Sequence, residues 1–376
     1  MWTRPALALL GLVSCAGVAA AQDFHIEEAG APKSWSLADL KPGTIKFSDH
    51  GGDGATSSTD LVPFQDWGRA HPNQKKFLIL FPGYGEDNGT AKDGDLAKDS
   101  DPARDGGTGA TKDAATKDVA AKDSSTAKDA IEPGKFYMYV AQARFLLDRA
   151  PEAIDLSRYA TLSFLEKIDP AIKHTLITAA DVKPFKSETG TTNDNPDRKW
   201  CTGRNTSICI QSTYKLEGKI PIGILLVNKL RDSAKKVADH IDFQSELSAL
   251  PPADLDQDGL KALTGIDAPV AGVLEQNCFY VNEILHFAKF YAVFQADPND
   301  TKKTVVTAFM AIAIEGKTLD KKRDYENVPV LRNLVPAQVL MGQSSFNSGT
   351  SISAGLPKYA RNEIATIAGL LAKDPK

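Results

Sequence analysis

The sequence lacks an excess of charge of either sign, and it lacks long apolar runs. Its formal net charge is -4 over 376 residues, which gives no basic surface for nucleic acid and no polyanionic character. After the N-terminal segment, no stretch reaches the roughly 18 uninterrupted apolar residues of a membrane helix. With 42% apolar and 24% charged residues, the composition is that of a soluble globular protein. We therefore expect no nucleic-acid partner and no transmembrane span in the mature chain.

The common local signatures of catalysis and cofactor binding are also missing. The chain has no P-loop and no G-x-G-x-x-G, and its six histidines show no H-x-x-x-H or H-E-x-x-H spacing for zinc. Ser233 and Lys236 fit S-x-x-K, but they lie in a charged amphipathic segment where chance explains the match. A nucleophile needs a base within hydrogen-bond reach, and no local spacing supplies one. The sequence favours a protein without catalytic activity, although a site assembled from distant segments would escape this search.

Cysteine is scarce, and the first of the four cysteines lies in a segment typical of export. Arg4, the apolar residues 6–18 and Ala19-Ala20-Ala21 form a signal-peptide pattern. Leu12-Val13-Ser14-Cys15 also matches a bacterial lipobox, in which Cys15 would carry a lipid. We expect residues 1–21 to be a signal peptide and the protein to be periplasmic or secreted. The alternative is a lipid anchor through Cys15.

Three cysteines remain once the leader is removed. In an oxidising compartment, Cys201 and Cys209 are close enough in sequence to close a short disulfide loop. Such a bridge would stabilise the fold by about 2–3 kcal/mol through loop entropy. We interpret the remaining Cys278 as a small buried hydrophobe.

Residues 91–132 differ in composition from the rest of the chain. A basic residue is followed directly by Asp at irregular intervals, at Lys92, Lys98, Arg104, Lys112, Lys117, Lys122 and Lys128. Because large apolar side chains are almost absent, this segment is predicted to be a disordered, solvated insertion. A role as a spacer that contacts the cell wall or another polyelectrolyte is the alternative.

Apolar runs flank this insertion on both sides. Residues 77–81 precede it and residues 136–140 follow it, and both are predicted to be strands of one sheet. Because loop-closure entropy grows only logarithmically with length, a long insertion in their connection is tolerated. We therefore predict one main domain, built from residues 22–90 and 133–376.

Residues 278–320 contain the densest apolar sequence of the chain. Its two arms, residues 287–296 and 304–314, flank the break Asp297-Pro298-Asn299-Asp300. Aromatic and β-branched residues with such a break favour a β-hairpin, and two apolar faces favour central strands. A buried helical hairpin is the alternative.

The remaining patterns complete an α+β prediction. Residues 208–216 alternate as a strand, and residues 220–227 are a second strand candidate after a turn. Residues 228–247 have helical spacing. A last helix is predicted to begin at Pro357 after a small-residue loop, with an apolar stripe of Ala360, Ile364, Ile367, Ala368 and Leu371. Short turns between strands, with helices between and after them, indicate a largely antiparallel sheet with amphipathic helices packed against it.

The most specific metal-like pattern is Asp254-Leu255-Asp256-Gln257-Asp258-Gly259. Alternating carboxylates with Gly at the sixth position are typical of a calcium loop, so Asp254, Asp256 and Asp258 are candidate calcium ligands. Gly265 stands at the twelfth position, where an EF-hand needs a bidentate acid. The alternative is an acidic turn in which Asp258 helps a helix to begin at Leu260. We otherwise expect no cofactor.

Residues 77–88, FLILFPGYGEDN, resemble the strand and loop that carry the oxyanion site in α/β-hydrolases. The resemblance covers about a dozen residues, and Phe81-Pro82 stands where those enzymes usually carry His-Gly. It implies a Ser elbow of the G-x-S-x-G type. The nearest segments, around Ser344-Ser345 and Ser351, lack the final Gly, and no His follows either of them.

Two classes of function therefore remain. The first is an exported, non-catalytic protein that binds or scaffolds an envelope or extracellular ligand. The second is a secreted hydrolase with a non-standard serine site around residues 82–86 and 344–353.

Overall fold

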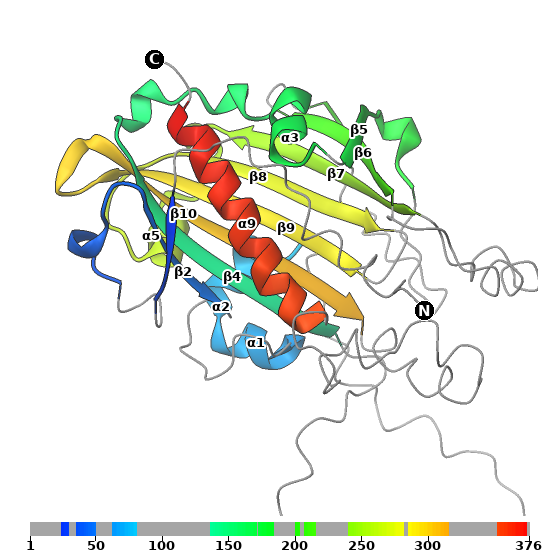
Figure 1. Cartoon of the computed structure of the whole chain (residues 1–376), viewed down its shortest axis with the longest axis horizontal. Coiled ribbons are helices and arrows are strands. Elements are labelled where there is room, and N and C mark those ends of the chain that lie inside the picture. The colour runs from blue at the N-terminus through cyan, green and yellow to red at the C-terminus, as the bar shows by residue number, and fades with distance from the viewer. Residues whose placement is uncertain are drawn as a thin grey trace, which may run out of the picture.

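The computed structural model describes residues 24–29, 35–49, 62–80, 136–170, 172–183, 200–203, 207–215, 240–281, 285–315 and 352–373. In this part of the chain, one sheet of ten strands carries helices on its two faces, which confirms the α+β prediction (Figure 1). The strands lie in the order β1 (His25–Glu28), β2 (Thr44–Asp49), β4 (Phe136–Leu147), β10 (Asp300–Glu315), β9 (Leu285–Asp297), β8 (Val270–Val281), β7 (His240–Leu250), β6 (Ser207–Lys215) and β5 (Ile172–Leu176). β3 (Val62–Pro63) pairs with β4, and β1 and β2 pair in parallel while the other pairs are antiparallel.

The predicted apolar hairpin lies near the middle of this sheet. β9 and β10 pair antiparallel, with β8 and β4 on their outer sides, so the helical alternative is wrong. Phe294 and Val306 belong to the core on one face of the sheet, which we call the first face. Val293 and Phe309 belong to the core on the opposite, second face. Both arms are therefore covered on two sides, as their two apolar patterns predict.

Helix α9 (Ile352–Lys373) covers the first face and runs obliquely across the strands (Figure 1). The predicted apolar stripe is buried against the sheet, as Ala360, Ile364, Ile367, Ala368 and Leu371 show. The helix begins at Ile352, five residues before the predicted start at Pro357, so it includes the last residues of the predicted loop. The stripe was correctly predicted because an amphipathic helix buries one side in a 3.6-residue period.

Two arginines attach α9 to the sheet at separate points. Arg361 contacts Glu28 through Nε and Asp49 through Nη2, with a distance of 3.1 Å to the Asp49 carboxylate. Its guanidinium also lies over the Phe47 ring, 4.5 Å from the centroid. Nearer the C-terminal end of the helix, Arg149 donates to the carbonyl oxygen of Leu371. These polar bonds therefore fix where α9 lies on the sheet, in addition to the contacts of its buried apolar stripe.

Three helices contribute to the core of the second face: α1 (Phe64–Ala70), α2 (Pro72–Leu78) and α5 (Gln257–Thr264). The predicted strand at residues 77–81 is wrong, because Phe77 and Leu78 end α2. Pro72 occupies the first turn of this helix, a position that proline tolerates. β2 and β3 precede the insertion in sequence, and both of them pair with β4.

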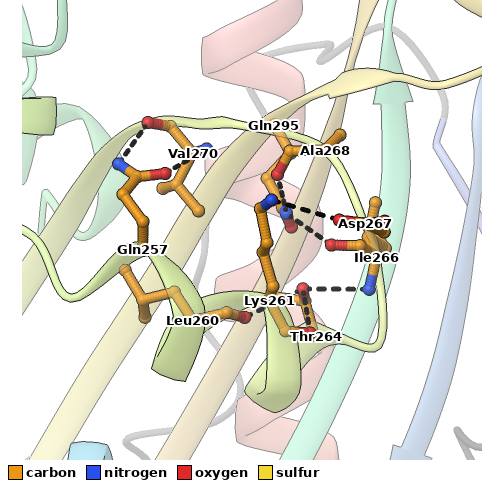
Figure 2. A network of polar contacts seen from close by, with 9 residues as sticks. All are labelled: Gln257, Leu260, Lys261, Thr264, Ile266, Asp267, Ala268, Val270 and Gln295. Carbon is orange, nitrogen blue, oxygen red and sulfur yellow. Dashed lines mark hydrogen bonds and ion pairs between the residues drawn. The ribbon is translucent and has the colours of Figure 1, made fainter.

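A polar network holds the connection from α5 to β8 (Figure 2). Gln257 donates to the Val270 carbonyl and accepts from its N–H, at 3.0 and 2.9 Å. Gln295 of β9 donates to the carbonyls of Ile266 and Ala268, at 3.0 and 2.9 Å. These bonds satisfy buried backbone groups of an irregular segment, as buried polar groups require.

Other predictions had mixed outcomes. The predicted strand at 208–216 is confirmed as β6, which pairs with β5 and β7. The predicted helix at 228–247 is wrong from His240 onward, where β7 begins. The leader (1–21), the insertion (91–132), the strand candidate 220–227 and the segment 228–239 lie outside the described residues. The remaining elements are α3 (Leu162–Ile168), η3 (Leu37–Asp39), η5 (Pro151–Ala153), η6 (Leu156–Arg158), η7 (Ala179–Asp181) and η9 (Pro252–Asp254).

Candidate functional site

The predicted calcium segment forms the start of α5. Asp256 is the N-cap, and its side chain accepts from the Gly259 N–H at 3.0 Å and from Lys76. The bond to Lys76 and the bond to Gly259 lower the pKa of Asp256. The cap is therefore Asp256, two residues before the predicted Asp258. Asp254 ends η9, and the described residues include no group of three or more acidic, His or Cys side chains placed to hold a metal.

The cysteines are arranged as the sequence predicts. Cys201 and Cys209 lie at disulfide distance, with their Cα atoms 5.5 Å apart. Cys278 is buried in β8, and desolvation raises the pKa of its thiol to about 12. A thiol with so high a pKa is a poor nucleophile near neutral pH.

The hydrolase-like segments fall mostly outside the described residues. Residues 82–86 and 344–351 belong to the undescribed part of the chain, so the juxtaposition of these loops stays a prediction. The strand that the resemblance implies at 77–81 is instead the end of α2. Ser353 lies in the first turn of α9.

A cluster of chemically active side chains lies elsewhere, between the first face and the helices α3 and α9. Its first pair is His174 on β5 and Ser212 on β6, which are register partners. His174 Nδ1 and Ser212 Oγ share a hydrogen bond of 2.8 Å. The Nε2 atom of His174 is buried and has no hydrogen-bond partner in the described chain. Desolvation lowers the pKa of His174, and the charges of Asp169 and Glu166 oppose that shift only in part.

The second part of the cluster comes from α9. Glu363 is only partly exposed, and desolvation, followed by the negative charge of Asp169, raises its pKa to about 8. Tyr359, one turn earlier, is also partly exposed, and desolvation raises its pKa well above the ordinary value. Asp169 is the C-cap of α3, and its charge affects His174, Tyr359 and Glu363 alike. Helix α3 packs against both β5 and α9, so these perturbed side chains belong to elements that meet at α3.

Apolar side chains border this group. Ile172 of β5, Cys278 and Val281 of β8 form a small buried core, with Phe243 and Ala288 packed against it. Ile172 stands two residues before His174 on the same face of β5, which places this apolar core beside the polar cluster. We name the set His174, Ser212, Tyr359 and Glu363 the helix-side cluster.

The helix-side cluster is mainly uncharged at neutral pH. The pKa shifts leave His174 neutral, Tyr359 as a phenol and Glu363 largely as a carboxylic acid. These forms donate and accept hydrogen bonds without carrying charge. Clusters of perturbed groups from several elements are characteristic of functional sites. The chemistry available is therefore hydrogen bonding in a desolvated setting.

Comparisons with known proteins give no assignment. No protein family matches the sequence, and no curated protein matches it. Solved structures with some likeness include the Zhui aromatase/cyclase from Streptomyces sp. R1128, at 10% identity and a TM-score of 0.31, over 63% of this chain and 93% of that chain. Norcoclaurine synthase from Thalictrum flavum in complex with dopamine and hydroxybenzaldehyde matches at 9% identity and a TM-score of 0.26, over 64% of this chain and 91% of that chain. Such low TM-scores carry no argument about this protein.

Of the helices within the described ranges, none combines the length and the apolar character that a membrane crossing needs.

Proposed function

We propose that the protein is an exported, non-catalytic binding protein and that the helix-side cluster is its ligand site. The observation that supports this role is that Tyr359 and Glu363 are strongly desolvated and yet retain exposed surface. Such a side chain has already lost most of its contacts with water. Forming a hydrogen bond to a ligand therefore costs it little further desolvation. Binding sites typically combine an apolar lining with a few polar groups in this way.

The ligand class follows from the charge state of the cluster. Because His174 is neutral and Glu363 is largely protonated near neutral pH, these two side chains offer hydrogen bonds without carrying charge, although the Asp169 carboxylate acts on both of them. The neighbouring Ile172 and Val281 are apolar. We propose a small, largely apolar, uncharged molecule that carries hydroxyl or carbonyl groups.

Matched variants test the site. Small uncharged molecules are screened for an increase in melting temperature, since a ligand that binds only the native state stabilises it by mass action. We expect that His174→Gln and Glu363→Ala weaken the response to the same compounds. The controls Lys173→Gln and Asn362→Ala change exposed neighbours on the same strand and helix, and they should respond as the parent does. Compounds that stabilise the parent and the site variants equally would contradict the proposed site.

Export is the second half of the proposal. The leader pattern and the Cys201–Cys209 pair are both typical of proteins that mature in an oxidising compartment. N-terminal sequencing of the protein from the cell exterior should give a chain that begins near Gln22. Recovery of a chain that begins at a lipidated Cys15 would favour the anchored alternative. Peptide mapping without reductant should recover Cys201 linked to Cys209, and a bridge to Cys278 would contradict that pairing.

A secreted hydrolase is the second candidate, favoured by the hydrogen bond between Ser212 and His174. Two observations favour binding over catalysis at this pair. Ser212 is 0% exposed, so its hydroxyl offers no surface to a substrate carbonyl, whereas the other members of the cluster are partly exposed and can contact a ligand. A catalytic triad requires an acceptor that orients the imidazole. Within the described chain, Nε2 of His174 has no such acceptor.

Activity screens separate the two candidates. Esterase, glycosidase, peptidase and phosphatase substrates should give no turnover with the purified mature protein. Turnover that Ser212→Ala abolishes would support a hydrolase at the helix-side cluster. Turnover abolished by changing Ser344, Ser345 or Ser351 to Ala would support the other predicted serine loops.

A further inference from the structure

Two cations lie directly opposite each other on the second face, away from the helix-side cluster. Lys46 of β2 and Arg144 of β4 are register partners in an antiparallel pair, so their side chains share one face of the sheet. Both are buried, with 9% and 3% of their surface exposed. Like charges directly opposite each other on paired strands are destabilising.

Within the described residues, neither cation forms an ion pair with a carboxylate. Arg144 donates from Nε to Thr307 Oγ1 at 3.3 Å and from Nη2 to the carbonyl of Thr264, and it lies over the Trp35 ring. Thr264 ends α5 (Figure 2), so the bond from Arg144 satisfies a carbonyl at a helix C-terminus. These partners leave Nη1 of Arg144 without a hydrogen bond within the described residues.

Lys46 has even fewer partners. It forms no ion pair or hydrogen bond within the described ranges. Its register partner on β1, Glu27, is exposed and does not reach it. Asp49, three residues later, points to the first face, where its carboxylate binds Tyr139 and Arg361. Glu27 is therefore exposed, and Asp49 is bound on the other face.

Polar side chains continue this patch along the same two strands. Ser48 and Gln142 are the next register pair on the second face, and they are 7% and 3% exposed. The Ser48 hydroxyl donates to the carbonyl of Asp49. Gln142 adds an amide group beside the two cations, and its NH2 group is a further donor.

We propose that Lys46, Arg144 and Gln142 form a binding site for a small oxyanion, such as a phosphate or a carboxylate group. An ammonium, an unused guanidinium nitrogen and an amide on adjacent strands supply several donors to one anion. An anion placed between the two cations accepts a charge-assisted hydrogen bond from each of them. Arginine suits this role because its planar guanidinium matches the oxygens of carboxylate and phosphate groups.

Calorimetric titration of the whole mature protein tests the proposal. Inorganic phosphate and acetate are titrated separately at constant ionic strength, with chloride as the compensating ion. We expect saturable binding of at least one of them. Lys46→Gln should weaken that binding about tenfold or more, as expected for the loss of one charge-assisted hydrogen bond.

Lys173→Gln is the matched control, because Lys173 is an exposed lysine on β5 at the other edge of the sheet. It should bind the anion as the parent does. The proposal fails if neither anion binds, or if Lys46→Gln and Lys173→Gln bind it equally well. The relative affinities of phosphate and acetate identify the class of oxyanion. The result does not depend on the helix-side cluster, which lies on the opposite face.

Discussion

Asn277 is a fully buried amide whose two polar atoms have no hydrogen-bond partner in the described chain. Its register partners are Glu246 on β7 and Lys289 on β9. Lys289 pairs with Glu275 at 3.0 Å, and both of these side chains are more than nine-tenths buried. Polar side chains are therefore concentrated on the second face of β7–β9. The Asn277 amide forms no hydrogen bond with those of the described residues.

The substitution Asn277→Leu is expected to stabilise the protein. Leu has a similar size and removes the unpaired donor and acceptor, whose desolvation penalty is about 1–3 kcal/mol. We expect the free energy of unfolding, measured by urea denaturation, to rise by about 1 kcal/mol or more. Asn362→Leu, at an exposed site, controls for a general effect of added apolar surface. A loss of stability in Asn277→Leu alone would indicate that ordered water pairs with the amide.

Glu363 should give the protein a stability that declines as the pH rises. Its pKa is raised from 4.5 in the unfolded chain to about 8 in the folded protein, mainly by desolvation. The folded state therefore holds a proton that the unfolded state releases, so stability falls between about pH 4.5 and pH 8. The slope from this group is at most about 1.4 kcal/mol per pH unit, and partial exposure reduces it.

Urea denaturation at several pH values, with the parent and Glu363→Gln, checks this linkage. The glutamine variant cannot ionise, so it should lose the slope that Glu363 contributes over this window. Equal slopes in the two proteins would show that Glu363 has an ordinary pKa in the folded state.

Helix α9 depends on Arg361 as well as on its apolar stripe. The side chain of Asp49 is 4% exposed, and Arg361 contacts it together with Glu28. Because removal of one partner leaves a buried carboxylate unpaired, Arg361→Met should lower the free energy of unfolding by about 3 kcal/mol. Asp49 keeps its bond from Tyr139, which limits the loss. The double variant Arg361→Met with Asp49→Asn should lose less than the two single losses added together, and full additivity would contradict the pairing.

The elements were predictable where the apolar pattern was long. β9, β10 and the stripe of α9 each extend over ten or more residues, so their periods are clear. Residues 77–81 form a short apolar run, which does not by itself distinguish a strand from a helix end. In β7, the buried residues Gln244, Glu246 and Ser248 are polar, so the usual alternation of apolar and polar residues does not reveal which face is covered.

The helix-side cluster was not predictable by spacing. His174 and Ser212 are 38 residues apart and meet only because of the register between β5 and β6. Glu363 lies nearly two hundred positions from Asp169, and α9 brings its carboxyl group close to that charge. The Cys201–Cys209 pair was predictable because only short-range geometry was needed.

The sheet carries different polar groups on its two faces. On the first face, α9 and α3 enclose the helix-side cluster, which is mainly uncharged at neutral pH, and the Arg361–Asp49 ion pair lies at another point of the same face. On the second face, charged side chains such as Lys46, Arg144 and the Glu275–Lys289 pair are buried. The hydrogen-bonded strands lie between the two faces, so the two sites that we propose are on opposite sides of one sheet.

The insertion at residues 91–132 should be dispensable for this scaffold. β2 and β3 precede it and β4 follows it, and both earlier strands pair with β4. Its composition predicts little buried surface, and shortening a flexible loop changes closure entropy by only about 0.6 kcal/mol per halving. Replacing these residues with a short Gly/Ser segment should therefore leave the melting temperature within about 4 °C of the parent.

A version of the same length with a scrambled sequence is the control and should also keep the parent value. A large fall in both variants would mean that the native sequence of the insertion packs against the domain, and a fall in the shortened variant alone would mean that the span needs the length.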